Sequence, residues 1–157
     1  MDEAELHEVV VVYIGGKPFA FPIDSVREVL PMLEPTPMPN WPDNILGIIE
    51  IRGDLVPLVE INQLLGLPPM KVSTKQFVLV VWVLDRLWGF VVDSVEGVRN
   101  TPIRQVDKIA PGVLQTSALC AGLLADPGAS IVLLAPLQVV QALKIPIEPI
   151  DQLGTHG

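Results

Sequence analysis

An internal repeat at an offset of 69 residues restricts the fold of this chain more than any other feature. Residues 11–29 align with residues 80–98, and each copy has the pattern of a strand, a tight turn, a second strand and a short turn that begins with Asp-Ser. The chain therefore has two similar halves. The identical positions are Val11/Val80, Val12/Val81, Phe21/Phe90, Asp24/Asp93, Ser25/Ser94, Val26/Val95 and Val29/Val98.

A second hairpin follows in each half. In residues 47–61 two apolar strands meet at residues 52–54, where Gly53 accepts the positive φ of a tight turn and Asp tolerates it. Pro57 lacks an N–H, which predicts an edge or bulged strand. Residues 122–134 are a weaker copy that bends at 126–128 and has no arginine there.

Capping, proline and glycine signals predict the remaining segments. They are a helical turn at 26–30 capped by Asp24 and Ser25, a stiff extended connection at 31–42, a helical turn at 62–66, a loop at 67–74 between the halves, and a helix at 137–143.

Composition favours an all-β fold. Half of the residues are hydrophobic, and sixteen prolines and twelve glycines indicate short strands with frequent turns. With no room for βαβ crossovers, we expect two small five-stranded β-barrels packed side by side, with short helices. The predicted boundaries are about 9–66 for barrel 1 and 75–136 for barrel 2, followed by the helix at 137–143 and a flexible tail at 146–157, all within one domain spanning residues 1–157.

Charge and hydropathy exclude several partner classes. The formal charge is -8 and no basic cluster occurs, so nucleic acid and anionic membranes are poor partners. The longest apolar run, Phe77 to Leu84, is far shorter than the roughly 20 residues that cross a bilayer. The acidic start does not resemble a signal peptide, and the single Cys120 fits a reducing cytoplasm.

The sequence contains no convincing catalytic set. His7 lies in the acidic lead-in, His156 is the penultimate residue, and Cys120 has no neighbouring cation or histidine. No metal, nucleotide or nucleophile motif is present. We therefore expect no enzymatic activity, no cofactor and no metal site.

Two features are not explained by folding alone. Arg52 suits either a local ion pair with Glu50 or Asp54, which composition slightly favours, or a contact with a partner. The second feature is a set of apolar side chains, one group per half, that are candidates to line the seam between the halves. Partly exposed, they would form a groove able to receive a helix from another protein, and fully buried they are only core. The set is Val26, Val29, Leu30, Val95 and Val98.

Three segments, in this order along the chain, resemble the CheW-like domain family, the coupling and scaffold module of bacterial chemosensory arrays. They are Phe21–Leu30, the hairpin that starts at Leu46, and Leu87–Val98, and the resemblance spans about residues 9–143. It implies two SH3-like barrels in a cytoplasmic, non-enzymatic adaptor. Its implied partners are the signalling tip of a chemoreceptor (methyl-accepting chemotaxis protein) and the regulatory domain of a CheA-type histidine kinase, in chemotaxis or pilus-driven motility.

The resemblance also implies residue roles. Four valines match the groove that receives the receptor tip, Arg52 with Gly53 matches the coupling signature, and Gly47 and Pro57 match its framing positions. The four valines are Val26, Val29, Val95 and Val98. Because the weaker hairpin copy lacks an arginine, we favour a docking role for Arg52.

Two alternatives remain. A small ligand-binding or enzymatic β-barrel would use the seam as a pocket and would need convergent polar groups there, whereas the candidates are valines. A severed regulatory domain of a kinase, or of an adaptor fused to a receiver domain, would show the same sequence features.

Overall fold

The computed structural model describes residues 5–104, 118–125 and 131–143, and these are mostly β-structure. None of the helices in these ranges has the length and apolar character needed to cross a bilayer. The elements in chain order are β1 (Leu6–Ile14), β2 (Lys17–Pro22), the 3-10 turn η1 (Ile23–Ser25), β3 (Val26–Pro31), β4 (Ile45–Ile51), β5 (Asp54–Val59), the 3-10 turn η2 (Gln63–Leu65), β6 (Phe77–Val83), β7 (Arg86–Val92), β8 (Ser94–Arg104), β9 (Cys120–Leu124), β10 (Val132–Leu134) and the helix α2 (Pro136–Leu143).

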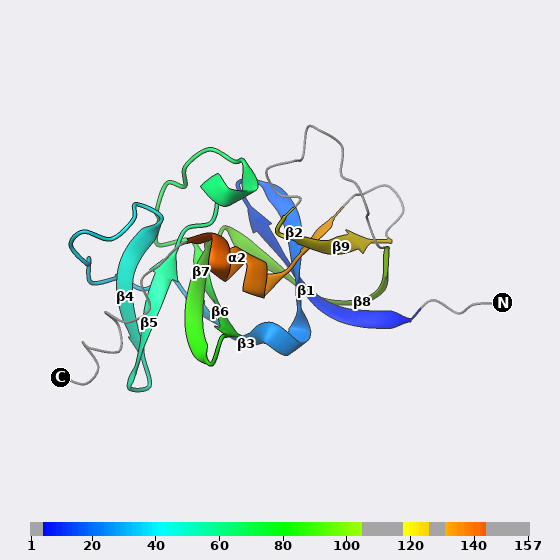
Figure 1. The fold of residues 1–157 in the computed structure, drawn as a ribbon, viewed down its shortest axis with the longest axis horizontal. Helices are drawn as coiled ribbons and strands as arrows, with labels where there is room; N and C mark the ends of the chain where they lie inside the picture. Colours follow the sequence, from blue (N-terminus) through cyan, green and yellow to red (C-terminus); the bar gives the residue numbers. More distant parts are fainter. Residues whose placement is uncertain (1–4, 105–117, 126–130, 144–157) are drawn as a thin grey trace.

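The strands form two five-stranded sheets (Figure 1). The first sheet is a closed barrel with the order β1-β2-β10-β9-β8, and the second has the order β3-β6-β7-β5-β4. This confirms the predicted all-β class with two five-stranded units. The predicted helix near residue 137 and the glycine-closed turn before Gly66 are also present as α2 and η2.

The two sheets exchange strands between the halves of the chain. β1 and β2 belong to the same sheet as β8, β9 and β10, whereas β3, β4 and β5 belong with β6 and β7. The chain crosses between the sheets after β2 and again after β7, at the Asp-Ser pairs of the repeat. Barrels over residues 9–66 and 75–136 are therefore wrong, because alternation in a sequence defines the faces of a strand but not its hydrogen-bonding partner. The loop at 67–74 joins two elements of the second sheet instead of separating the halves. The bend at 126–128 and the tail at 146–157 lie outside the described residues.

The third strand of each copy pairs with the first strand of the other copy, and both pairs contain a β-bulge at the same position. In one pair Val26 faces Val81 and Glu28 faces Val80; in the other, Val95 faces Val12 and Gly97 faces Val11. The helical turn predicted at 26–30 is thus wrong, since these residues form β3. The bulge adds one residue to the strand, so that its alternation imitates the spacing of a helical turn.

Three apolar clusters hold the sheets together. One fills the closed barrel and includes Val9, Val11 and Leu133, and a second fills the interior of the second sheet and includes Val78 and Leu58. The third and largest cluster lies between the sheets, receives side chains from both, and is covered by α2. Successive residues of β1 and of β6 point alternately into two different clusters, which explains why their sequences are continuous apolar runs. We call the largest cluster the shared core.

The second sheet is closed only in part between its end strands, β3 and β4. Thr36, in the proline-rich connection, forms an isolated antiparallel bridge with Ile48 of β4, with two backbone hydrogen bonds of 2.9 Å. A Cβ on Gly47 would stand 2.3 Å from the carbonyl oxygen of Thr36. Glycine is therefore required at Gly47 by the close approach of the connection, which contains a turn at residues 39–40 with Asn40 at a φ of 65°.

Three hairpins have two-residue turns in which both central residues have positive φ. In the β4–β5 turn these are Arg52 at 49° and Gly53 at 89°, so the left-handed residue beside the glycine is Arg52 and not the predicted Asp54. β5 lies between β4 and β7, so the edge position predicted from Pro57 is also wrong. The β4–β5 pair does contain a bulge, between Ile45 and Gly47 of β4.

Candidate protein-interaction site

Val29 and Val98 occupy equivalent positions in the two copies and are both exposed. Val29 on β3 is 39% exposed and Val98 on β8 is 59% exposed. Their cross-strand neighbours are Leu79 and Val10, and both neighbours belong to the shared core. Because cross-strand neighbours point to the same face of a sheet, the two valines lie where the shared core reaches solvent.

The other residues of the predicted groove are more buried. Val26 and Val95 are half-buried and pack against the shared core, so they support the same face as Val29 and Val98. Leu30 does not belong to this set. It pairs with Val78 and packs against the interior cluster of the second sheet.

Arg52 forms an ion pair with Glu28 of β3, through its Nη2 and the Glu28 Oε2. This differs from the local pair with Glu50 or Asp54 that composition favoured. The Arg52 side chain is 73% exposed and the Glu28 side chain 23% exposed. Since β3 and β4 are the end strands of the second sheet, the pair joins the tip of the β4–β5 hairpin to the opposite end strand.

The framing positions have structural roles. Gly47 admits the backbone of Thr36, and Pro57 is buried opposite Ile48. No heavy atom lies within 4 Å of a Cβ placed on Gly53, so only its φ of 89° favours glycine. The Arg-Gly pair is therefore set by the turn itself, which holds the Arg52 backbone in a left-handed conformation at the tip.

The two Asp-Ser pairs do not have the capping role predicted for them. In the first pair, the Ser25 hydroxyl donates to the carbonyl of Pro22 at 2.8 Å, and η1 has no side-chain cap. In the second pair, no helical turn follows, and the Asp93 Oδ2 accepts the backbone N–H of Gly16 at 3.0 Å. Asp93 therefore ties the β1–β2 turn to the point where the chain changes sheets.

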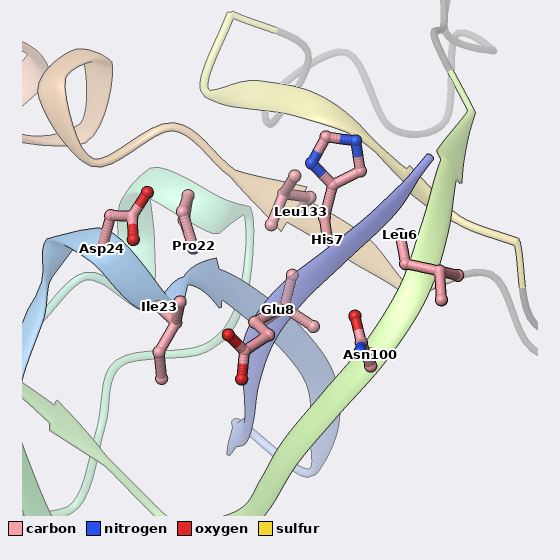
Figure 2. A pocket seen from close by; sticks show the side chains of 9 residues that line it. Leu6, His7, Glu8, Pro22, Ile23, Asp24, Asn100 and Leu133 are labelled. Atoms are coloured by element: carbon pink, nitrogen blue, oxygen red, sulfur yellow. The ribbon is translucent and has the colours of Figure 1, made fainter. Parts of the chain in front are cut away.

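A pocket of about 500 Å³ lies on the closed barrel, and its lining residue Asn100 is two residues from Val98 on β8 (Figure 2). Figure 2 shows Ile23 and Asp24 on one side, Leu6 and Asn100 on the other, and Glu8 between them. Within the described ranges no group of three or more His, Cys, Asp or Glu side chains is arranged to hold a metal ion. The rest of the pocket lining consists of Val9 and Leu133, which belong to the cluster inside the barrel, and of Pro22 and His7.

Sequence reasoning missed one surface feature. Trp82 is 40% exposed, with the Arg27 guanidinium 4.9 Å from its ring centroid. Beside it, Leu84 is 49% exposed in the β6–β7 turn. The repeat contained a signal for this feature, because Leu84 stands where the first copy has Gly15.

The exchanged sheets, each of five strands and joined by a shared core, define an all-β protein built from two SH3-like units. A family model described as the CheW-like domain matches residues 8–144, and the chain belongs to this family.

Two relatives show the range of the family. The chain is 29% identical to the chemotaxis protein CheW of Rhizobium meliloti (strain 1021) over 99 residues, which are 63% of this chain and 64% of the relative. It is 32% identical to the protein PilI of Pseudomonas aeruginosa over 90 residues, which are 57% of this chain and 51% of the relative. In both alignments the matched part spans less than two thirds of the relative.

A solved structure confirms the fold. The crystal structure of the scaffolding protein TtCheW from Thermoanaerobacter tengcongensis matches with a TM-score of 0.75 at 22% sequence identity. The match covers 85% of this chain and 92% of the other. At this identity the likeness concerns the arrangement of the backbone.

Proposed function

We propose that this chain is a non-enzymatic adaptor that couples chemoreceptors to a CheA-type histidine kinase in a chemosensory pathway. The observation that carries the proposal is that Val29 and Val98, at equivalent positions of the two copies, are both exposed at the margin of the shared core. An adaptor must offer its partners a surface that is not used in its own folding, and these two valines provide one. Membership of the CheW-like domain family supports the proposal.

In the proposed complex, the groove valines receive the helical signalling tip of the receptor. Val29 and Val98 supply exposed apolar contacts. Val26 and Val95 are half-buried beside them and pack against the shared core. An amphipathic helix that buries these side chains would gain about 25 cal/mol for each Å² of apolar surface removed from water. Leu30 contributes to the second sheet instead.

Arg52 with Gly53 is proposed as the coupling signature. The turn presents the guanidinium at the tip of a hairpin, and Glu28 holds it there. A partner carboxylate could bind the exposed side of the guanidinium without breaking the fold, since its side chain is largely in solvent. The proposed site of action is the cytoplasm, where receptor tips and the kinase meet.

The proposal is tested by titrating the full chain with an isolated receptor signalling tip and with the kinase regulatory domain from the same organism. We expect saturable binding to each and a ternary complex when both are present. Absence of binding to either partner would overturn the proposal. A strong rise in melting temperature with one compound of a metabolite panel would instead favour the ligand-binding alternative.

A further inference from the structure

The β6–β7 turn contains a leucine, Leu84, in a left-handed backbone conformation. The equivalent turn of the first copy has a glycine at this position. Leu84 and Asp85 have φ values of 54° and 61°, and the equivalent turn of the first copy, Gly15 and Gly16, has φ values of 61° and 79°. Glycine adopts this conformation freely and Asp tolerates it, whereas a leucine does so only at a cost in free energy. The same chain thus builds the same turn without a leucine.

Burial does not compensate this cost. Leu84 is 49% exposed, and the neighbouring Trp82 is 40% exposed. Strained residues with exposed apolar side chains are characteristic of sites where a function, and not stability, selects the residue. The tip of the β6–β7 hairpin is therefore a candidate contact surface.

Arg27 adds a fixed positive charge to this surface. Its guanidinium lies over the Trp82 ring, at 4.9 Å from the centroid, which holds it in one orientation. Among the described residues Arg27 has no carboxylate partner. A stacked guanidinium with free N–H groups recognises a carboxylate, and tryptophan and arginine are the residues that most often dominate binding energy at interfaces.

The surface lies on the opposite side of β6 from the groove valines. Val81 and Val83 on either side of Trp82 point into the shared core, so Trp82 points away from it. Val29 faces the shared-core side, next to Leu79. The valine groove and Trp82 therefore lie on different faces of the second sheet.

The same end of the second sheet carries the Arg52 turn. β5 and β7 run parallel, with Leu58 beside Gly89, so the turns that precede them lie at one end of the sheet, as Figure 1 shows for the two hairpins. Of the four residues other than glycine with positive φ in the described part of the chain, three are in these two turns.

We propose that Arg27, Trp82 and Leu84 form a docking face for a protein partner that presents a carboxylate beside an aliphatic side chain. The partner is different from the one in the valine groove. The inference rests on the proposed function, which requires two partners to be held at once, and the kinase regulatory domain is the probe.

The decisive variant is Leu84→Gly in the full chain, because it relieves the turn and removes the contact together. We expect a melting temperature equal to or above that of the wild type, about tenfold weaker binding of the regulatory domain, and unchanged binding of the receptor tip. Arg27→Gln should weaken the same binding and reduce its salt dependence. Val72→Ala, which changes an exposed apolar residue of another loop, is the matched control and should change neither.

The other outcomes overturn the inference. Wild-type affinity in Leu84→Gly overturns it while the proposed function stands, and a lowered melting temperature makes Leu84 a structural residue. Loss of self-association in Leu84→Gly, with unchanged binding of the regulatory domain, assigns the face to a second copy of the chain. If the wild type does not bind the regulatory domain, the proposed function and this inference fail together.

Discussion

Arg52 joins two parts of the second sheet and is also the most exposed charge of the candidate site. We predict that Arg52→Ala leaves the melting temperature nearly unchanged, because an ion pair with so exposed a guanidinium contributes at most about 1 kcal/mol. Binding of the partner should fall. Thermal denaturation and titration of the same preparation measure both quantities.

The partner of Arg52 offers a control. Glu28→Gln removes the ion pair but keeps the guanidinium, so it should preserve most of the binding if Arg52 contacts a partner directly. Equal loss of binding in both variants would mean that the pair acts by fixing the hairpin. A clearly lowered melting temperature with normal binding in Arg52→Ala would make the residue structural.

Val98 tests the groove. Its side chain is mostly in solvent, so Val98→Asp should cost at most about 1 kcal/mol of stability, the range of strand propensities. A buried carboxylate at an apolar interface is costly, so binding of the receptor tip should fall at least about tenfold. Val72→Asp, at an exposed site outside the sheets, should bind normally. A folded Val98→Asp protein with full affinity would remove the valines from the site.

At the residue scale, the repeat identified the candidate site better than composition did. It aligned Val29 with Val98, and both proved to be exposed at the edge of the same core. Composition instead paired Arg52 with its sequence neighbours. The carboxylate that binds it, Glu28, is distant in sequence and reaches Arg52 only because the end strands of a twisted sheet approach each other.

Comparing two glycines distinguishes a position where a side chain would clash from one where only the backbone conformation favours glycine. Gly47 and Gly97 have φ values of 146° and 140°, but a Cβ at Gly47 would meet the Thr36 carbonyl and one at Gly97 would meet no atom within 4 Å. We predict that Gly97→Ala costs about 1–3 kcal/mol for backbone strain. Gly47→Ala should cost about 1–3 kcal/mol more, for the clash.

Chemical denaturation of the two variants measures the difference. Equal losses would mean that the connection moves aside without cost, and that the bridge between Thr36 and Ile48 contributes little. A larger loss for Gly47→Ala identifies this bridge as a closing element of the second sheet.

At the element scale, the sequence predicted the strands and hairpins well and their irregularities poorly. Both faces are buried over residues 9–12 of β1 and 78–81 of β6, and the long apolar runs indicated strands correctly. β3 was predicted as helix because its bulge places two side chains out of alternation. A bulge depends on the partner strand, which lies elsewhere in the sequence, so five residues alone do not reveal it.

The strand exchange makes the whole molecule one cooperative unit. We predict that the fragments 1–70 and 71–157, made separately, lack fixed tertiary structure, because β1 and β2 on one fragment need β8 and β10 on the other. Mixing the fragments should restore the near-ultraviolet circular dichroism of the intact chain. A fragment that folds alone, with protected amides, would contradict the exchanged topology.

The arrangement of the two sheets could not be read from the repeat. A repeat shows that each half contains the same elements, and two self-contained barrels or two exchanged ones satisfy it equally. Which of the two arrangements forms depends on the direction of the chain at the Asp-Ser pairs. The geometry of a turn as short as the three-residue η1 is set by packing against the shared core more than by local preference.

The exchange has a consequence for synthesis. β2 finds its parallel partner β10 only about 110 residues later, which at ribosomal rates is a delay of roughly 5–20 s. In the first part of this interval, until β8 is synthesised, the valine-rich β1 has one partner strand and an open edge, the kind of edge that promotes aggregation. A chain that ends before residue 94 never gains the strand that covers this edge. Capture by chaperones or proteolysis, and not partial activity, is therefore the expected fate of truncated products.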